Sequence, residues 1–252
     1  MRGALFEALT RNFCSEAFGP EAAQPYHKAT CPVCWLLWAD DPQATRGENV
    51  ARPYTIQPPL DRIHFAGGQV MTFGVSLIGK AQDMLPYIAR AVQKMGSIGV
   101  GRGRGRFTLL AIEEIHPLLD TTRQLMDGHR VKRPTLQITP GVVHDLALQL
   151  PAHAVTLDLL TPTRLTANNT LMRQITPRVF MQRLFERCQN LTEQYAEYAS
   201  DTSSPAPIRE DWLTAQDELL AAADGLQTGY DETVWVEAFS GSRRTGRVSP
   251  IS

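Results

Sequence analysis

The chain has 252 residues, with 25 Lys and Arg against 26 Asp and Glu, which gives a formal net charge of −1. This length fits one large domain or two small ones, each able to bury a core without disulfides or metals. Because the charge is balanced, the chain is not a generally basic coat for nucleic acid, and a polyanion has to be bound by a local patch. Hydrophobic residues make up 43% and charged residues 20%, as in globular rather than disordered chains.

Neither the start of the chain nor its cysteine content indicates secretion or a membrane. Residues 1–7 lack the long apolar segment of a signal peptide, and every apolar run is shorter than the roughly 18 residues of a membrane span. Four cysteines are too few for a disulfide scaffold. We therefore expect a soluble cytoplasmic protein with no membrane association.

The first half predicts a helix, a long loop and then a strand–helix–strand unit. Leu5, Leu9 and Phe13 share one helical face, and the proline-rich residues 14–60 are expected to be mostly loop with a short edge strand near residues 54–56. Alternation over residues 71–77 predicts a strand.

Apolar residues then recur at helical spacing from Leu85 to Met95, and Gly96 is expected to cap that helix. A glycine-rich loop and a strand-like segment, residues 107–112, follow. Strand, helix, loop and strand form the second half of a ferredoxin-like unit, in which the order is β-α-β-β-α-β.

The second half repeats this pattern and then stops early. Residues 155–159 alternate like a strand, Thr176 and Pro177 begin a long helix, a second helix ends near Gly225, and residues 233–239 resemble another strand. We predict an α+β protein of two tandem ferredoxin-like units, the second incomplete. The predicted parts are a first domain over residues 1–115, an interdomain passage over 116–152 and a second domain over 153–252.

The loop before residue 107 alternates glycine with arginine. It is not a nucleotide-binding P-loop, because Arg102 stands where that motif needs lysine followed by serine or threonine. Bare backbone N–H groups and guanidinium groups both bind phosphate, although a solvated basic turn is an equal alternative for an isolated loop. Between a helix and a strand of a ferredoxin-like unit, the loop favours RNA. The candidate RNA-binding residues are Gly101, Arg102, Gly103, Arg104, Gly105, Arg106 and, in the basic tail, Arg243 and Arg244.

The cysteines allow two interpretations. Cys31 and Cys34 have the spacing of a metal-binding pair, and Cys14 and His27 upstream would complete a three-cysteine, one-histidine zinc site. Packing of the two cysteines as small buried residues beside Trp35 is favoured, because Cys14 belongs to the predicted helix and its distance to Cys31 is irregular. On that interpretation no metal and no cofactor is expected.

Tyr26, His27 and Lys28 are adjacent in the loop after the first helix. Imidazole transfers protons near neutral pH, a phenol can assist, and an ammonium can stabilise a negatively charged transition state. Three successive side chains diverge, and an exposed loop histidine is the simpler interpretation. The remaining histidines are isolated, apart from His144 beside Asp145, and are assigned no role.

Several motifs occur in an order that one known family shares, namely residues 2–5, 31–34, 52–54, 58–59, 77–81, 99–107, 161–165 and 239–244. The chain is similar to the CRISPR-associated endoribonucleases that process precursor CRISPR RNA, members of the repeat-associated mysterious protein (RAMP) superfamily. Family members usually have a strand before the first helix and a glycine-rich loop after the last basic segment, and both are absent here. The resemblance covers nearly the whole chain.

This resemblance implies metal-independent cleavage of CRISPR repeat RNA. A general base would take the proton of a 2′-OH group, which attacks the adjacent phosphate and leaves a 2′,3′-cyclic phosphate and a 5′-OH end. His27 matches the family by location and is the expected acid or base, with Tyr26 and Lys28 assisting. The expected partners are repeat RNA and subunits of a CRISPR effector complex. The alternatives are a non-catalytic RNA-holding subunit of such a complex and an unrelated zinc-bearing scaffold.

Overall fold

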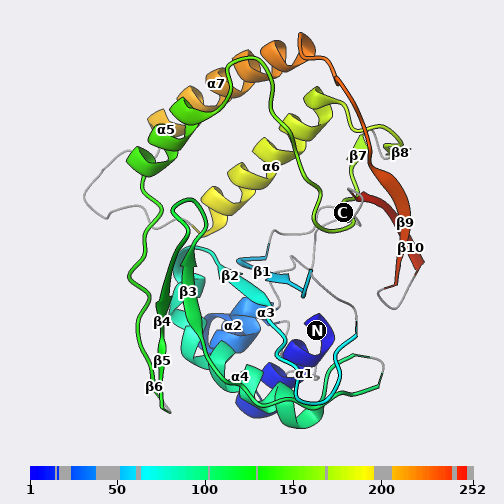
Figure 1. Ribbon diagram of the computed structural model, residues 1–252. Coiled ribbons are helices and arrows are strands. Elements are labelled where there is room, and N and C mark those ends of the chain that lie inside the picture. Colours follow the sequence, from blue (N-terminus) through cyan, green and yellow to red (C-terminus); the bar gives the residue numbers. More distant parts are fainter. Residues whose placement is uncertain are drawn as a thin grey trace. The chain divides into compact units, whose positions relative to one another are not determined.

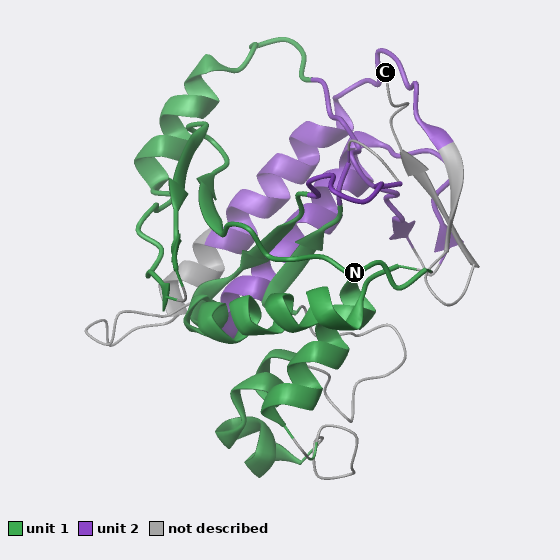
Figure 2. Ribbon diagram, turned by 60° about the horizontal axis from the view of Figure 1, so that its bottom comes forward, with its two compact units in different colours: residues 1–58, 72–155 green, residues 59–71, 156–252 purple. Residues whose placement is uncertain are grey.

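The computed structural model divides the chain into two compact units (Figure 2). Unit 1 comprises residues 1–58 and 72–155, and unit 2 comprises residues 59–71 and 156–252. The predicted domains over 1–115, 116–152 and 153–252 stay a prediction. The structure describes residues 1–14, 16, 24–37, 52–60, 64–101, 103–128, 130–167, 170–195, 206–239 and 243–248, with only the backbone for 206–211 and 235–248.

The N-terminal part of unit 1 contains three helices (Figure 1). The predicted first helix is confirmed as α1 (Arg2–Phe13), whose Leu5 and Leu9 are buried. Two short helices follow in a segment that we expected to be loop, α2 (Pro25–Thr30) and α3 (Pro32–Leu37). Each begins at a proline, because the fixed φ of proline suits a first helical position, where no N–H bond is needed.

A strand pair and a long helix complete the core of unit 1. The antiparallel strands β1 (Tyr54–Gln57) and β2 (Gly74–Leu77) confirm the two strands expected there. A 3₁₀ turn, η2 (Gly79–Met84), leads into α4 (Leu85–Ile98), which packs against α1. The core contains the buried face of α4 together with residues of α1 and α3, among them Leu9, Val33, Leu36, Leu37, Ile88, Val92 and Met95.

The end of α4 differs from the expectation. Gly96 lies inside the helix, and the C-terminal cap is Gly99, whose φ is +92°. Gly96 instead permits a close approach, since the Phe107 N–H donates to its carbonyl at 3.1 Å and a Cβ would overlap the Phe107 carbonyl. Residues 107–112, which we expected to form a strand, belong to no strand.

Among the described residues of unit 1 after residue 112, the strands form two hairpins, and one helix follows them. Strand β3 (Glu113–His116) pairs with β4 (Thr121–Gln124), and β5 (Met126–Asp127) pairs with β6 (Arg130–Val131). The hydroxyl of Thr139 caps α5 (Pro140–Gln149) by accepting from the Val142 N–H at 3.3 Å. The segment predicted as an interdomain passage is therefore largely structured.

Unit 2 contains two long helices and two hairpins. The two predicted helices are confirmed as α6 (Pro177–Tyr195) and α7 (Ala206–Asp224), which pack through an edge-to-face contact of Phe185 with Trp212 at 5.8 Å. Strand β7 (Thr166–Ala167) pairs with β8 (Thr170–Leu171), and β9 (Val234–Phe239) pairs with β10 (Arg243–Val248). Residues 155–159 form no strand.

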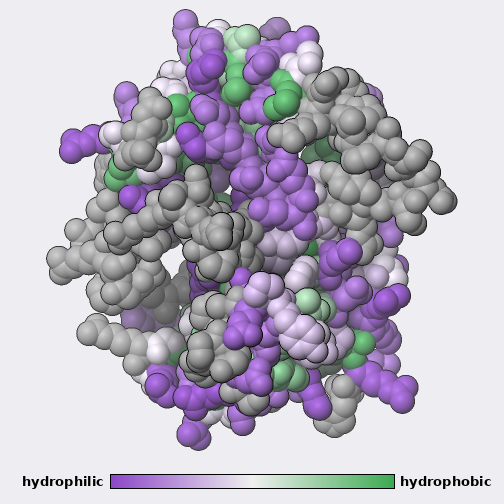
Figure 3. All heavy atoms as spheres, turned by 180° about the vertical axis from the view of Figure 1, so that it is seen from behind, coloured by the Kyte–Doolittle hydropathy of each residue, from purple (hydrophilic) through white to green (hydrophobic). Residues whose placement is uncertain are grey.

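The structure confirms an α+β protein of helices and small antiparallel strand pairs. Hydrophilic residues predominate on the described part of the face in Figure 3, where hydrophobic residues form scattered patches. No helix among the described residues is long and apolar enough to cross a membrane.

Candidate functional site

Four possible metal ligands converge where the three N-terminal helices meet. Cys14 follows the last residue of α1, His27 lies in α2, Cys31 separates α2 from α3, and Cys34 lies in α3. Their ligand atoms all lie within 4.8 Å of one another. We call these four residues the Cys/His cluster.

The distances within the cluster approach those around a tetrahedral zinc ion. The His27 Nε2 atom lies 3.3 Å from the Cys14 Sγ and 3.2 Å from the Cys34 Sγ, and the two sulfurs are 3.4 Å apart. Ligands at typical Zn–S and Zn–N bond lengths would be separated by about 3.8 Å for two sulfurs and about 3.6 Å for sulfur and nitrogen. For these three atoms, displacements of a few tenths of an ångström would reach the separations around a bound ion.

Local sequence explains why these side chains meet. The Cys31 N–H donates to the His27 carbonyl at 2.8 Å and closes α2, and Pro32 then begins α3. Cys31 immediately precedes α3 and Cys34 lies in the first turn of that helix, so one short stretch of chain supplies both sulfurs. Cys14 comes from a distant part of the sequence, and the packing of α1 against α3 brings it to them.

The outer nitrogen of His27 has its own partner. The Nδ1 atom lies 2.8 Å from the Glu16 Oε2, and the His27 side chain is only 17% exposed. A carboxylate that accepts from the second ring nitrogen fixes the tautomer in which Nε2 carries the lone pair, as is usual for histidines that bind metals. Both ring nitrogens of His27 are therefore engaged.

Burial raises the pKa of the Cys34 thiol far above its ordinary value of 9.0, and contacts with the Cys14 and Cys31 thiols raise it further. This shift favours the protonated thiol, so a metal ion that binds there has to displace the proton.

The predicted catalytic trio does not converge on one point. Tyr26, His27 and Lys28 are successive residues of α2, whose side chains point about 100° apart. Tyr26 is 80% exposed, whereas His27 points into the Cys/His cluster.

The predicted RNA-binding loop forms a tight hairpin at the end of α4. Val100 and Gly105 exchange two backbone hydrogen bonds, each of 2.9 Å. Arg104 adopts a φ of +47°, and both Arg104 and Arg106 are exposed. Arg102 lies outside the described residues. Arg243 and Arg244 are in β10, opposite Phe239 and Ala238, so the expected basic tail contains a strand.

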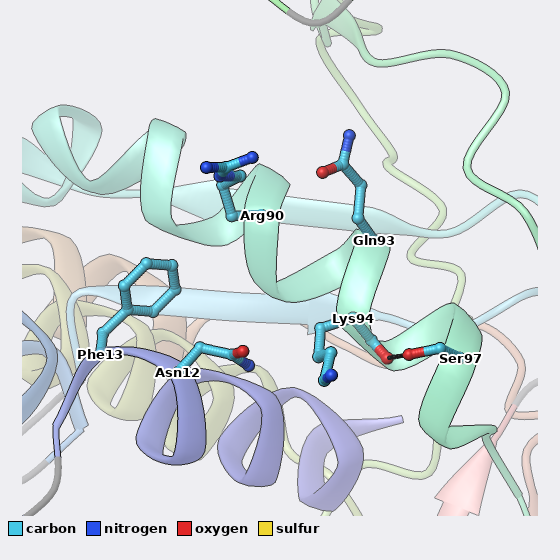
Figure 4. Close-up of a pocket in the computed structure, with 6 residues that line it drawn as sticks. All are labelled: Asn12, Phe13, Arg90, Gln93, Lys94 and Ser97. Carbon is cyan, nitrogen blue, oxygen red and sulfur yellow. Dashed lines mark hydrogen bonds between the residues drawn. The ribbon is translucent and has the colours of Figure 1, made fainter.

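A groove of about 400 Å³ lies between the end of α1 and the exposed face of α4 (Figure 4). In Figure 4, Phe13 rises from α1 toward α4, and Lys94 points from α4 toward α1. Arg90 and Lys94 supply two cations to its lining. Their spacing on the polar face of a predicted helix was the signal in the sequence that could have pointed to this surface. No pattern in the sequence singled out Glu16.

His116 is one of the isolated histidines, and the structure shows hydrogen-bond partners for both of its ring nitrogens. It is buried, its Nδ1 accepts from the Leu118 N–H at 3.3 Å, and its Nε2 lies 3.1 Å from the Gln137 carbonyl oxygen. This arrangement satisfies a neutral imidazole and serves the packing of unit 1.

Residues 1–137 match the family AF_1859_N, which is described as an N-terminal domain. The match covers more than half of the 252 residues. The chain belongs to this family. The part of the chain matched by AF_1859_N includes the whole Cys/His cluster and the basic loop. No curated protein and no solved structure matches the chain significantly.

Proposed function

We propose that this protein binds CRISPR repeat RNA and cleaves it without a metal ion in the reaction. The product ends are a 2′,3′-cyclic phosphate and a 5′-OH. The proposal includes a cytoplasmic location in antiviral defence, association with effector-complex subunits, and a RAMP-type architecture in which both units derive from ferredoxin-like folds.

The observation that carries the proposal is the basic hairpin at the end of α4. Its backbone turn presents the exposed guanidinium groups of Arg104 and Arg106 beside Gly101 and Gly103, which have no side chain to shield their amides. Such a loop suits a phosphate backbone, to which arginine binds through two parallel hydrogen bonds. The same segment, residues 99–107, is part of the resemblance to the processing endoribonucleases.

Two further basic residues on α4 add to the positive charge of the hairpin. Arg90 and Lys94 lie on the exposed face of the helix that leads directly into the hairpin. A single strand of RNA that follows the hairpin would find two further cations along α4. Phosphate contacts of this kind supply affinity without reading sequence.

Cleavage by this route needs a proton acceptor for the 2′-OH and a donor for the leaving 5′-oxygen. His27 was the residue expected from the resemblance, with Tyr26 and Lys28 beside it. Its engaged ring nitrogens, at Cys34 and Glu16, disfavour that role and favour a ligand role. The same observation supports the second candidate function, a non-catalytic subunit that holds repeat RNA in an effector complex.

One experiment tests binding and cleavage together. The purified chain is incubated with end-labelled repeat RNA, and with the same RNA carrying a 2′-deoxynucleotide at the mapped cleavage position. We expect cleavage of the first RNA only, since the 2′-OH is the nucleophile, with equal affinity for both. Tight binding without cleavage of either RNA would support the holding subunit, and absence of binding would refute both functions.

The contribution of the hairpin is measured from the dependence of affinity on salt. Replacing Arg104 and Arg106 by Ala removes up to two phosphate contacts, each worth about 0.7 in the slope of log K against log salt for single strands. The matched control replaces Lys132 and Arg133, two exposed cations of the same unit, by Ala. An equal loss in both variants would show that the hairpin has no specific role.

A further inference from the structure

We propose that Cys14, His27, Cys31 and Cys34 bind one Zn²⁺ ion in a closed tetrahedral site that holds α1, α2 and α3 together. This site is structural, and it is independent of the proposed RNA cleavage.

The donor set fits zinc. Three thiols and one imidazole nitrogen lie within 4.8 Å of one another, which matches the number and type of ligands in a three-cysteine, one-histidine centre. Soft sulfur donors favour zinc over magnesium or calcium, which take oxygen ligands. Because the protein supplies all four ligands, no position remains for water or substrate, as in structural rather than catalytic zinc sites.

The position of the cluster indicates what the ion does. Helices α2 and α3 have six residues each, too few to be stable from their own hydrogen bonds. The four ligands join both short helices to the end of α1, and the buried side chains of Leu36 and Leu37 follow directly in α3. A bound ion would fix these helices against the core of unit 1.

The surroundings of His27 provide a second, independent observation. A metal-binding imidazole commonly donates its other N–H to a carboxylate, and Glu16 lies 2.8 Å from that nitrogen. This contact directs the lone pair of Nε2 toward the sulfurs, as metal binding requires. Glu16 is therefore a positioning residue, which acts on the ion through His27.

Metal-free alternatives leave the cluster poorly satisfied. All four cysteines of the chain are free, so no disulfide joins the sulfurs. The thiols of Cys14 and Cys34 are buried, and among the described residues they contact each other and His27, with Cys31 a further neighbour of Cys34. In these contacts the sulfurs are weak donors and acceptors. Zinc would replace these weak contacts with four coordinate bonds.

The direct test is metal analysis of the purified full chain, followed by exchange of the metal for Co²⁺. We expect one zinc per chain, and in the cobalt form the absorption of a tetrahedral site together with thiolate-to-cobalt charge transfer. Zinc well below one per chain, combined with a cobalt form that lacks thiolate charge transfer, would overturn the proposal.

Two variants keep the proposal falsifiable even if loss of the ion unfolds the chain. Glu16→Ala leaves all four ligands in place and is expected to weaken zinc affinity by about 10–100-fold, measured by competition with a chelator. Cys188→Ser, which changes the one cysteine outside the cluster, should leave affinity and cobalt spectrum unchanged. Unchanged affinity in Glu16→Ala would contradict the positioning role, and an altered cobalt spectrum in Cys188→Ser would contradict the ligand set.

Discussion

Glu114 shows how one buried carboxylate can tie a hairpin to a distant segment. Burial alone would raise its pKa, but hydrogen bonds from the Leu136 and Thr135 N–H groups and the Thr135 hydroxyl, together with the charge of Arg123, lower the pKa below its usual 4.5. The ionised form is therefore favoured in the folded state, and it joins β3 to residues 135–136.

We expect Glu114→Gln to destabilise the protein at neutral pH by about 1–3 kcal/mol, the usual contribution of hydrogen bonds to a charged group. A carboxyl whose pKa is lowered on folding stabilises the fold above its unfolded pKa, and this contribution disappears as the pH falls through the folded value. The difference between wild type and variant, measured by urea unfolding, should therefore shrink below about pH 4.5. The exposed neighbour Glu113, changed to Gln, is the control and should show no such dependence.

Replacing Gly96 by alanine is expected to lower stability, although helix propensity alone would favour alanine. Alanine is favoured over glycine inside a helix by up to about 1 kcal/mol, yet a Cβ at Gly96 would overlap the carbonyl of Phe107. Gly96→Ala should therefore lower stability by about 1–3 kcal/mol through overpacking. Gly3→Ala in α1, where nothing lies within 4 Å of an added Cβ, should be neutral or stabilising. Thermal unfolding of the two variants gives the comparison.

Among the secondary-structure elements, the sequence predicts those helices whose apolar residues repeat at helical spacing. Helices α1, α4, α6 and α7 were predicted because each repeats apolar residues over several turns. Helices α2 and α3 were missed because six residues contain too few turns to show a period, and their first prolines were interpreted as marks of a loop. The cap of α4 was placed at Gly96 rather than Gly99, since both glycines satisfy the same rule in the sequence.

Two strand predictions failed for a related reason. Residues 107–112 form a short, mostly apolar run and residues 155–159 alternate apolar and polar side chains. Either pattern specifies a strand only where a neighbouring strand accepts its hydrogen bonds. In the first segment, the Phe107 N–H bonds to Gly96 of α4, and the Ile112 carbonyl accepts from Leu125 and Met126.

The candidate metal site, too, was only partly predictable from the sequence. The spacing of Cys31 and Cys34 is readable along the chain, and it was noticed as a metal-binding pair. Cys14 and His27 were also named as possible ligands, but packing was favoured over zinc, because no local pattern shows that α1 packs against α3. The partner role of Glu16 likewise appears only in three dimensions.

For the molecule as a whole, the two proposals meet at His27. Structural zinc contributes about 10–16 kcal/mol of apparent binding free energy in small zinc-binding peptides, and that energy is available for folding. His27→Ala could abolish RNA cleavage either by removing an acid–base group or by releasing the ion. An alanine variant therefore cannot separate a catalytic role from a ligand role.

His27→Cys separates these roles, because cysteine supplies a fourth thiolate ligand but has no imidazole. If His27 only binds zinc, the variant should keep one zinc per chain and cleave repeat RNA at close to the wild-type rate. If His27 transfers the proton, the variant should keep its zinc and its RNA affinity but lose cleavage by about 10²–10⁴-fold, the usual contribution of an acid–base group. Cys34 and Glu16 contact the two ring nitrogens of His27. We therefore expect the first result. Single-turnover cleavage rates and metal content of the same preparations decide between them.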